Sequence, residues 1–242
     1  ELSEVITYRV LKVADMGESA VDDLIGHLIA GSSNPTVGVL AHPGQVDIRI
    51  ATKAKSVEEA RKLIAPVEQE VRSLLGQRVF AVDDESIEEV VGKLLRQKNA
   101  SIAVYEDLTG GLVGDRLQQA SPDHFLEGII GNSPMSERRL LNHSARIDHS
   151  DKLRPGSPTL VEELAWAIKG HAESDLGLAL HSVQDPSDMA ENLAKGQTSI
   201  SITDGKSSKS RTYNMAGRGW PDRTRMSLNA MDLVRSALLE GI

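Results

Sequence analysis

Four side chains able to move protons or bind cations follow predicted strands in the second half of this 242-residue chain, namely Asp107, Glu137, His181 and Asp185. Each falls at the end of a strand or in the adjoining loop, so the four could converge in the fold. Carboxylates with one histidine could hold a divalent cation, and a carboxylate could instead act as a general base on water in a hydrolase. We favour a third interpretation, a solvated acidic surface without a metal, because the sequence does not establish ligand spacing.

A second candidate site is the turn Thr109-Gly110-Gly111, which stands between a predicted strand and a predicted helix. Backbone amides at a helix N-terminus face outward and can bind an anion such as a phosphate. Three residues form a weak motif, however, and glycines also serve any tight strand-to-helix turn. We therefore favour a packing role for this turn and keep anion binding as the alternative.

The first 85 residues show the order strand, helix, strand, strand, helix, strand. Residues 46–51 alternate apolar and polar side chains, which is typical of a half-buried strand. Ser56 and Glu59 have the spacing of a capping box, and Gly76 ends the helix that they begin. The other strands are predicted at 5–13, 36–40 and 79–82, and the first helix begins near residue 18. This order predicts a small two-layer α/β domain with its helices on one face of a sheet.

From residue 86 to 242, strands alternate with helices, which predicts a three-layer α/β/α domain. Strands are predicted at 101–105, 125–131 and 176–180, followed by a hairpin of 198–203 and 210–215. Helices are predicted from 86 to 95, from about 112, and over 159–172 and 222–239. The acidic run Asp83-Asp84-Glu85 marks the junction between the two domains.

Charge and composition exclude several classes of function. Lys and Arg number 27 against 35 Asp and Glu, a net charge of −8 that repels a phosphate backbone. The element order of the first domain resembles an RNA-binding KH module but lacks a Gly-x-x-Gly loop and a basic face, so we predict no nucleic-acid binding. The chain has no cysteine, no apolar run that could span a membrane and no signal peptide, so we expect a cytoplasmic protein without a membrane partner. Its start at Glu1 suggests a piece of a longer protein.

Motifs in the first domain and at its junction follow one another in a specific order: Gly17-Glu18-Ser19-Ala20, Asn34-Pro35-Thr36-Val37, Pro43-Gly44-Gln45-Val46-Asp47-Ile48-Arg49 and Asp83-Asp84-Glu85-Ser86. Their order and spacing resemble the middle domain of the CinA family, the competence/damage-inducible proteins A. The second domain is similar to the CinA C-terminal domain, whose fold is that of nicotinamide-nucleotide amidohydrolase. The resemblance covers the whole chain and implies a KH-like domain followed by an amidohydrolase-like domain.

In the amidohydrolase family, a serine within Ala-Glu-Ser-Cys-Thr-Gly-Gly attacks the carboxamide of a nicotinamide nucleotide and releases ammonia, and a second motif supplies a tyrosine and a lysine. The similar stretch here reads Tyr105-Glu106-Asp107-Leu108-Thr109-Gly110-Gly111, so Asp107 takes the place of the serine. Asn132 and Glu137 take the places of the tyrosine and the lysine, and His181 replaces a loop threonine. No catalytic residue of the family is therefore expected intact, and losing even one member of a catalytic unit reduces the rate by orders of magnitude.

The resemblance leaves four ligand-binding positions, Thr109, Gly110, Gly111 and Arg225. It implies a domain that has lost nicotinamide mononucleotide deamidase activity and that serves the assembly or support of an N-terminal, molybdopterin-binding-like pyrophosphatase domain. A homodimer is expected, with no cofactor. Two alternatives stay open: an active amidohydrolase with a rearranged site, and a module that binds another small-molecule nucleotide through these four positions.

Overall fold

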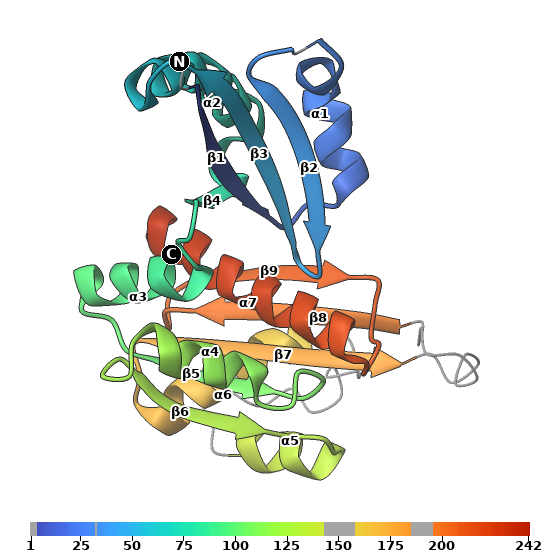
Figure 1. Cartoon of the computed structure of the whole chain (residues 1–242). Coiled ribbons are helices and arrows are strands. Elements are labelled where there is room, and N and C mark those ends of the chain that lie inside the picture. Colours follow the sequence, from blue (N-terminus) through green and yellow to red (C-terminus); the bar gives the residue numbers. More distant parts are fainter. Residues whose placement is uncertain (1–3, 32, 143–157, 185–195) are drawn as a thin grey trace. The chain divides into compact units, whose positions relative to one another are not determined.

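The computed structural model describes residues 4–31, 33–142, 158–184 and 196–242. The chain divides into two compact units, Glu1–Ile87 and Glu88–Ile242, and each unit is built on a sheet of its own (Figure 1). Both units combine a sheet with packed helices. The predicted α/β class, a small KH-like domain followed by a larger α/β/α domain, is thereby confirmed.

The first unit has the predicted element order. Its elements are β1 (Val5–Ala14), α1 (Glu18–Gly31), β2 (Thr36–His42), β3 (Gln45–Ala54), α2 (Val57–Leu75), a short 3₁₀ turn (Gly76–Arg78) and β4 (Val79–Val82). The strands form an antiparallel sheet in the order β2-β3-β1-β4. Only β2 and β3 are both consecutive in the chain and paired in the sheet. The connections from β1 to β2 through α1 and from β3 to β4 through α2 each pass over one strand.

The alternating pattern of β3 separates the two faces of the first sheet. Val46, Ile48 and Ile50 are buried beneath α1 and α2 and form part of the core of this unit. The opposite face exposes the apolar side chains of β1 and β2, which are Ile6, Tyr8 and Leu40. The start of α2 is fixed as predicted, because the Ser56 side chain accepts a hydrogen bond from the Glu59 amide at 3.2 Å.

The second unit contains a mixed, five-stranded sheet. Its elements are α3 (Ile87–Lys98), β5 (Ile102–Glu106), α4 (Leu112–Ala120), β6 (Phe125–Ile130), α5 (Pro134–Leu141), α6 (Pro158–Ala172), β7 (Leu176–Gln184), β8 (Gly196–Thr203), β9 (Ser208–Tyr213) and α7 (Trp220–Glu240). The strand order is β6-β5-β7-β8-β9. The strands β6, β5 and β7 are parallel to one another, β8 pairs antiparallel with β7, and β9 pairs antiparallel with β8.

Helices cover both faces of this second sheet. On one face, α4 and α7 pack against each other and against the strands, and on the other face α6 lies over β5 and β7 with α5 beside it (Figure 1). Every residue of β5 is buried, as expected for a parallel strand with helices on both sides. The result is the predicted three-layer α/β/α arrangement.

The helix α5 is an element that the sequence prediction did not contain. Its start is well specified, because Ser133 caps the helix by accepting a hydrogen bond from the Ser136 amide at 3.2 Å, and Pro134 stands in the first turn. Its end is held by Leu140 and Leu141, which are buried in the core beside α6. The helix is important for the site because it carries Glu137 in its first turn.

Candidate functional site

The candidate site lies at the carboxyl ends of the parallel strands of the second unit. The chain leaves β5 through α4 to reach β6 on one side, and later returns through α6 to β7 on the other side. Such a reversal of strand order is where α/β sheets bind their ligands. Asp107 follows β5 directly, Glu137 comes from the helix after β6, and His181 lies on β7.

The structure brings three of the four predicted acid–base residues together. His181 Nδ1 lies 3.3 Å from Asp107 Oδ2 and 3.7 Å from Glu137 Oε1. The histidine is only 5% exposed, and its ring nitrogens make no aligned hydrogen bond to any described residue. Charge therefore holds the ring between the two carboxylates. The fourth residue, Asp185, lies outside the described ranges.

Backbone amides hold the Asp107 carboxylate in place. Its Oδ2 accepts a hydrogen bond from the Ser182 amide on β7 at 2.7 Å, and its Oδ1 accepts one from the Leu108 amide. The same Oδ2 also contacts His181. Both oxygens are thus already engaged by the protein, which orients the carboxylate toward β7.

The pKa values of the cluster shift in ways that its geometry explains. Burial alone lowers the pKa of His181. The contact with Asp107 and the charge of Glu137 raise the pKa by more than burial lowers it, so the net shift is upward. Burial raises the pKa of Glu137, and the charge of Asp107 adds to this rise, while His181 and Arg138 oppose it; the net shift is again upward. A proton is therefore bound more tightly within this cluster than on isolated side chains.

Tyr105 lies under the cluster as a neutral hydroxyl. Its side chain is fully buried, and the hydroxyl donates a hydrogen bond to the Gly131 carbonyl at 3.2 Å. Burial and then the charges of Glu137 and Asp107 raise its pKa. The hydroxyl therefore stays protonated and acts as a structural donor rather than as a base.

The turn Thr109-Gly110-Gly111 has the backbone conformation that its glycines predict. Gly110 and Gly111 have positive φ angles of 60° and 100°, which other residues rarely adopt. Thr109 is fully buried, and its carbonyl accepts hydrogen bonds from Arg223 Nε at 3.1 Å and Nη2 at 2.7 Å. The turn is therefore packed within the unit and bound to α7 by the Arg223 guanidinium group.

Glu106 occupies the position where an anion would meet the N-terminus of α4. This carboxylate is 1% exposed and accepts hydrogen bonds from the Val113 amide at 3.2 Å and the Gly114 amide at 2.9 Å. It also accepts one from the Thr109 hydroxyl. Amides at the N-terminus of α4 thus already have a carboxylate of the chain as their acceptor.

Two further predicted positions are exposed to solvent. Asn132 is exposed in the loop before α5, and Arg225 is exposed on α7. Arg223 on the same helix contacts the turn, and the ligand-binding role implied for Arg225 stays a prediction. Within the described residues, no group of three or more His, Asp and Glu side chains is arranged to hold a metal ion.

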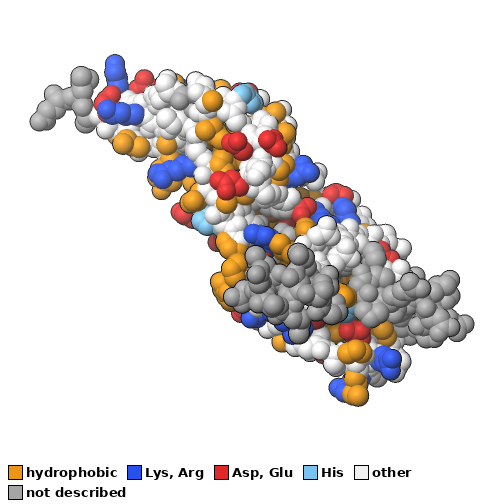
Figure 2. Space-filling model, turned by 90° about the vertical axis from the view of Figure 1, so that its right-hand side faces the viewer, with side chains coloured by type: hydrophobic (Ala, Val, Ile, Leu, Met, Phe, Trp, Pro, Cys, Tyr) orange, Lys and Arg blue, Asp and Glu red, His pale blue; other side chains and the backbone are white. Residues whose placement is uncertain are grey.

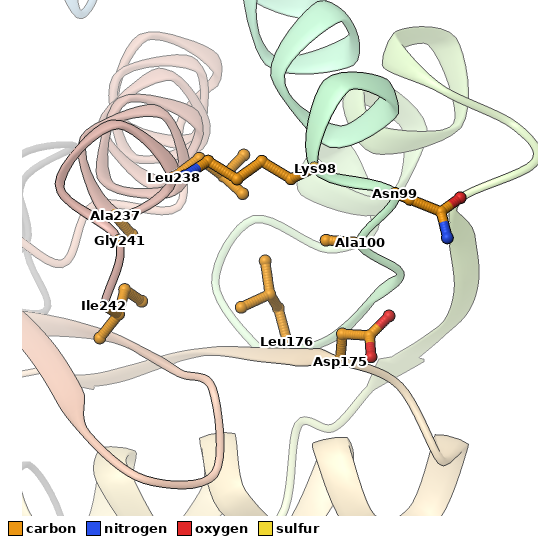
Figure 3. Close-up of a pocket in the computed structure, with 9 residues that line it drawn as sticks. All are labelled: Lys98, Asn99, Ala100, Asp175, Leu176, Ala237, Leu238, Gly241 and Ile242. Carbon is orange, nitrogen blue, oxygen red and sulfur yellow. The ribbon is translucent and has the colours of Figure 1, made fainter.

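A hollow of about 260 Å³ lies at the opposite end of the parallel strands, near the starts of β5 and β7 (Figure 3). Its lining is mainly apolar, formed by Ala100, Leu176, Ala237, Leu238 and Ile242 with Lys98, Asn99, Asp175 and Gly241. The Asp175 carboxylate is already bound by the Ser101 amide at 2.8 Å and the Ser101 hydroxyl at 2.7 Å. The hollow is remote from Asp107 and His181 and is not part of the candidate site.

Charged side chains of both signs lie on the described surface (Figure 2), and the absence of a nucleic-acid partner stays a prediction. On the face shown in Figure 2, basic and acidic side chains of the described residues are interspersed. A protein that binds the phosphate backbone usually gathers Lys and Arg in one stripe or patch. Among the described helices, none combines the length and apolarity needed to cross a membrane.

Fold and site together define an α/β protein in which a KH-like unit precedes a three-layer unit with its acid–base cluster at the carboxyl ends of the parallel strands. Residues 8–81 match the KH domain of damage-inducible protein CinA, and residues 84–238 match the CinA C-terminal domain. The chain therefore belongs to the CinA family, as its motifs predicted.

Individual relatives agree with this assignment. The chain is 33% identical to a CinA-like protein of Acaryochloris marina over 96% of its own length and 55% of that protein. It is also 33% identical to a putative competence-damage inducible protein of Caldanaerobacter subterraneus, over 99% of its own length and 57% of that protein. The chain thus spans a little over half the length of these relatives.

Solved structures of the CinA superfamily share the fold of the second unit. A protein from Klebsiella pneumoniae superposes with a TM-score of 0.53 at 16% identity, covering 64% of this chain and 96% of that one. A protein from Enterobacter cloacae gives 0.52 at 18% identity, covering 64% of this chain and 94% of that one. At these identities the likeness establishes the fold alone.

Proposed function

We propose that the second unit is a catalytically degenerate member of the nicotinamide-nucleotide amidohydrolase type, unable to release ammonia from nicotinamide mononucleotide. Its remaining role would be the assembly or support of the further domain that longer CinA proteins carry, a molybdopterin-binding-like pyrophosphatase. A homodimer and a cytoplasmic location belong to the same proposal. The length of the relatives, of which this chain covers a little over half, supports the existence of such a domain in the whole protein.

The proposal rests on the position and the hydrogen bonds of Asp107. It takes the place of the family's serine, yet both of its oxygens accept backbone hydrogen bonds, and one of them also contacts His181. A carboxylate in this position has no hydroxyl to attack a carboxamide, and it would have to form an anhydride with a poor electrophile. The nucleophilic step of the family reaction therefore has no group to perform it at this position.

The charge around Asp107 argues against the family's substrate as well. Glu137 takes the place of the lysine and lies beside the same histidine, so the cluster holds two carboxylates against one imidazole. Nicotinamide mononucleotide carries a phosphate, and like charges at close range repel. This observation disfavours both alternatives, the active enzyme with a rearranged site and the binding module for another nucleotide.

An ammonia-release assay tests the proposal directly. The full chain is incubated with nicotinamide mononucleotide, and its rate is compared with that of the Asp107→Ala variant. We expect equal rates at the background level. A wild-type rate clearly above the variant's would establish the rearranged enzyme, whereas thermal stabilisation by the nucleotide without turnover would support the binding module instead.

A further inference from the structure

His181 links elements that are far apart in the sequence. It projects from β7 toward Asp107, which follows β5, and toward Glu137, in the first turn of α5. The two ends of α5 are held differently. Leu140 and Leu141 are packed in the apolar core, whereas the first turn is tied to the sheet through Glu137 and the histidine.

The tie depends on charge. The side chains of Asp107 and Glu137 are 12% and 16% exposed, so water screens them only in part. A protonated His181 lies between them as the shared cation. When it is neutral, two partly buried carboxylates share a site without a counter-charge, and such a pair is unfavourable.

We propose that His181 is a pH-responsive clamp: its imidazolium binds Asp107 and Glu137 and fixes the first turn of α5 to the sheet, and loss of its proton releases that turn. The clamp does not require the domain to be inactive, so its test is independent of the ammonia assay. It adds a conformational role to a cluster in which the family's nucleophile and lysine are missing.

Within the described ranges, few other charged groups face the cluster from the elements around it. On β5 the neighbouring titratable group is the neutral Tyr105, and on α5 the exposed Arg138 favours the ionised form of Glu137. Among the described residues, only Asp107 and Glu137 act electrostatically on His181. The pH response of the first turn of α5 should therefore follow this histidine and its two carboxylates.

The direction of the pH response follows from the pKa shifts. His181 has a raised pKa in the folded protein, so its stabilising effect is complete below the unfolded value of about 6.5 and is lost as the pH rises through the folded value. The raised pKa of Glu137 sets the acidic limit of the clamp, because a carboxyl group that has taken up a proton no longer attracts the imidazolium. The clamp is thus closed at mildly acidic pH and open at alkaline pH.

Hydrogen exchange of backbone amides reports on this turn. The amides of Ser136 and Glu137 donate to the Ser133 carbonyl at 2.9 and 3.2 Å, and the Asn142 amide at the other end donates to Arg138 at 2.9 Å. Exchange of the full chain is measured between about pH 5.5 and 8.5 and expressed as protection factors, which removes the intrinsic pH dependence. As the pH rises, we expect the protection factors of the Ser136 and Glu137 amides to fall at least about fivefold, which is the size of effect typical of coupled residues in contact. The protection factor of the Asn142 amide should change less.

Matched variants separate the clamp from general effects of pH. Glu137→Gln and His181→Gln each remove one partner, and either variant should abolish the pH-dependent step at the first turn of α5. The control is Glu127→Gln, whose carboxylate makes a similar contact with His171 at 3.5 Å in the same unit but at an exposed site. That variant should keep the wild-type profile. A flat or rising profile in the wild type, or an unchanged step in Glu137→Gln, would overturn the proposal.

Discussion

Replacing Glu106 tests whether this residue is the internal anion that organises the turn before α4. In the Glu106→Ala variant the Thr109 hydroxyl and the amides of Val113 and Gly114 lose their acceptor. The side chain is 1% exposed, so bulk water cannot readily replace the carboxylate. The perturbation therefore leaves three donors unsatisfied within the protein.

The magnitude follows from these donors. A buried donor left without a partner costs about 1–3 kcal/mol, and the effects of neighbours are not fully additive, so we expect a loss of about 3–6 kcal/mol in the free energy of unfolding. The Glu106→Gln variant keeps one acceptor oxygen but turns an NH₂ group toward the remaining donors. It should lose less, about 1–3 kcal/mol.

The natural tryptophans allow this loss to be measured in the second unit alone. Both tryptophans, Trp166 and Trp220, lie there, so their fluorescence during urea unfolding does not report on the first unit. This matters because a chain of two units need not unfold in one step. Glu127→Ala is the surface control and should stay within about 0.5 kcal/mol. A loss below about 1 kcal/mol in Glu106→Ala would show that the carboxylate is not needed to order the turn.

The same fluorescence assay checks two more substitutions. In Gly131→Ala the new methyl group would overlap the buried ring of Tyr105, so we expect the free energy of unfolding to fall by about 1–3 kcal/mol. Its control is Gly170→Ala in α6, where the new methyl group meets no atom within 4 Å. That variant should gain about 0.5–1 kcal/mol in the free energy of unfolding. An unchanged free energy of unfolding in Gly131→Ala would mean that the Tyr105 ring can move aside. Asp232→Asn should lose about 3–5 kcal/mol, because the carboxylate is 3% exposed and accepts from Arg235 and Arg211, each at 2.8 Å. A loss under about 1 kcal/mol would show that these arginines find other partners.

Much of the fold could be predicted because its elements carry strong local signals. The alternation in β3 and the capping residues of α2 are each sufficient to identify an element. For α5 the signals are present in Ser133 and Pro134, but the helix is only eight residues long and no helix was predicted there. Short helices depend on tertiary packing, here of Leu140 and Leu141, and that packing is not visible in a local pattern.

The site was harder to predict because side-chain direction depends on the whole fold. Arg223 and Arg225 are two residues apart on α7, so they point to nearly opposite sides of the helix. The sequence cannot tell which of them faces the turn, and the structure places Arg223 there. The sequence signals assign no role to Glu106 beyond its place in the stretch from Tyr105 to Gly111. Its role as the acceptor for the α4 N-terminus depends on how closely that helix follows the strand.

The three replaced positions of the site are physically dependent on one another. Asp107 alone would place an extra carboxylate beside Glu137, and among the described residues only His181 pairs with both carboxylates and can compensate their charge. Returning position 107 to serine would remove one negative charge, yet the Ser182 amide would lose its acceptor and His181 would lose one of its two carboxylate contacts. A single reversion therefore cannot restore a nucleophile without disturbing the cluster. We propose that the three replacements form one alternative arrangement, suited to holding α5 against the sheet rather than to attacking a carboxamide.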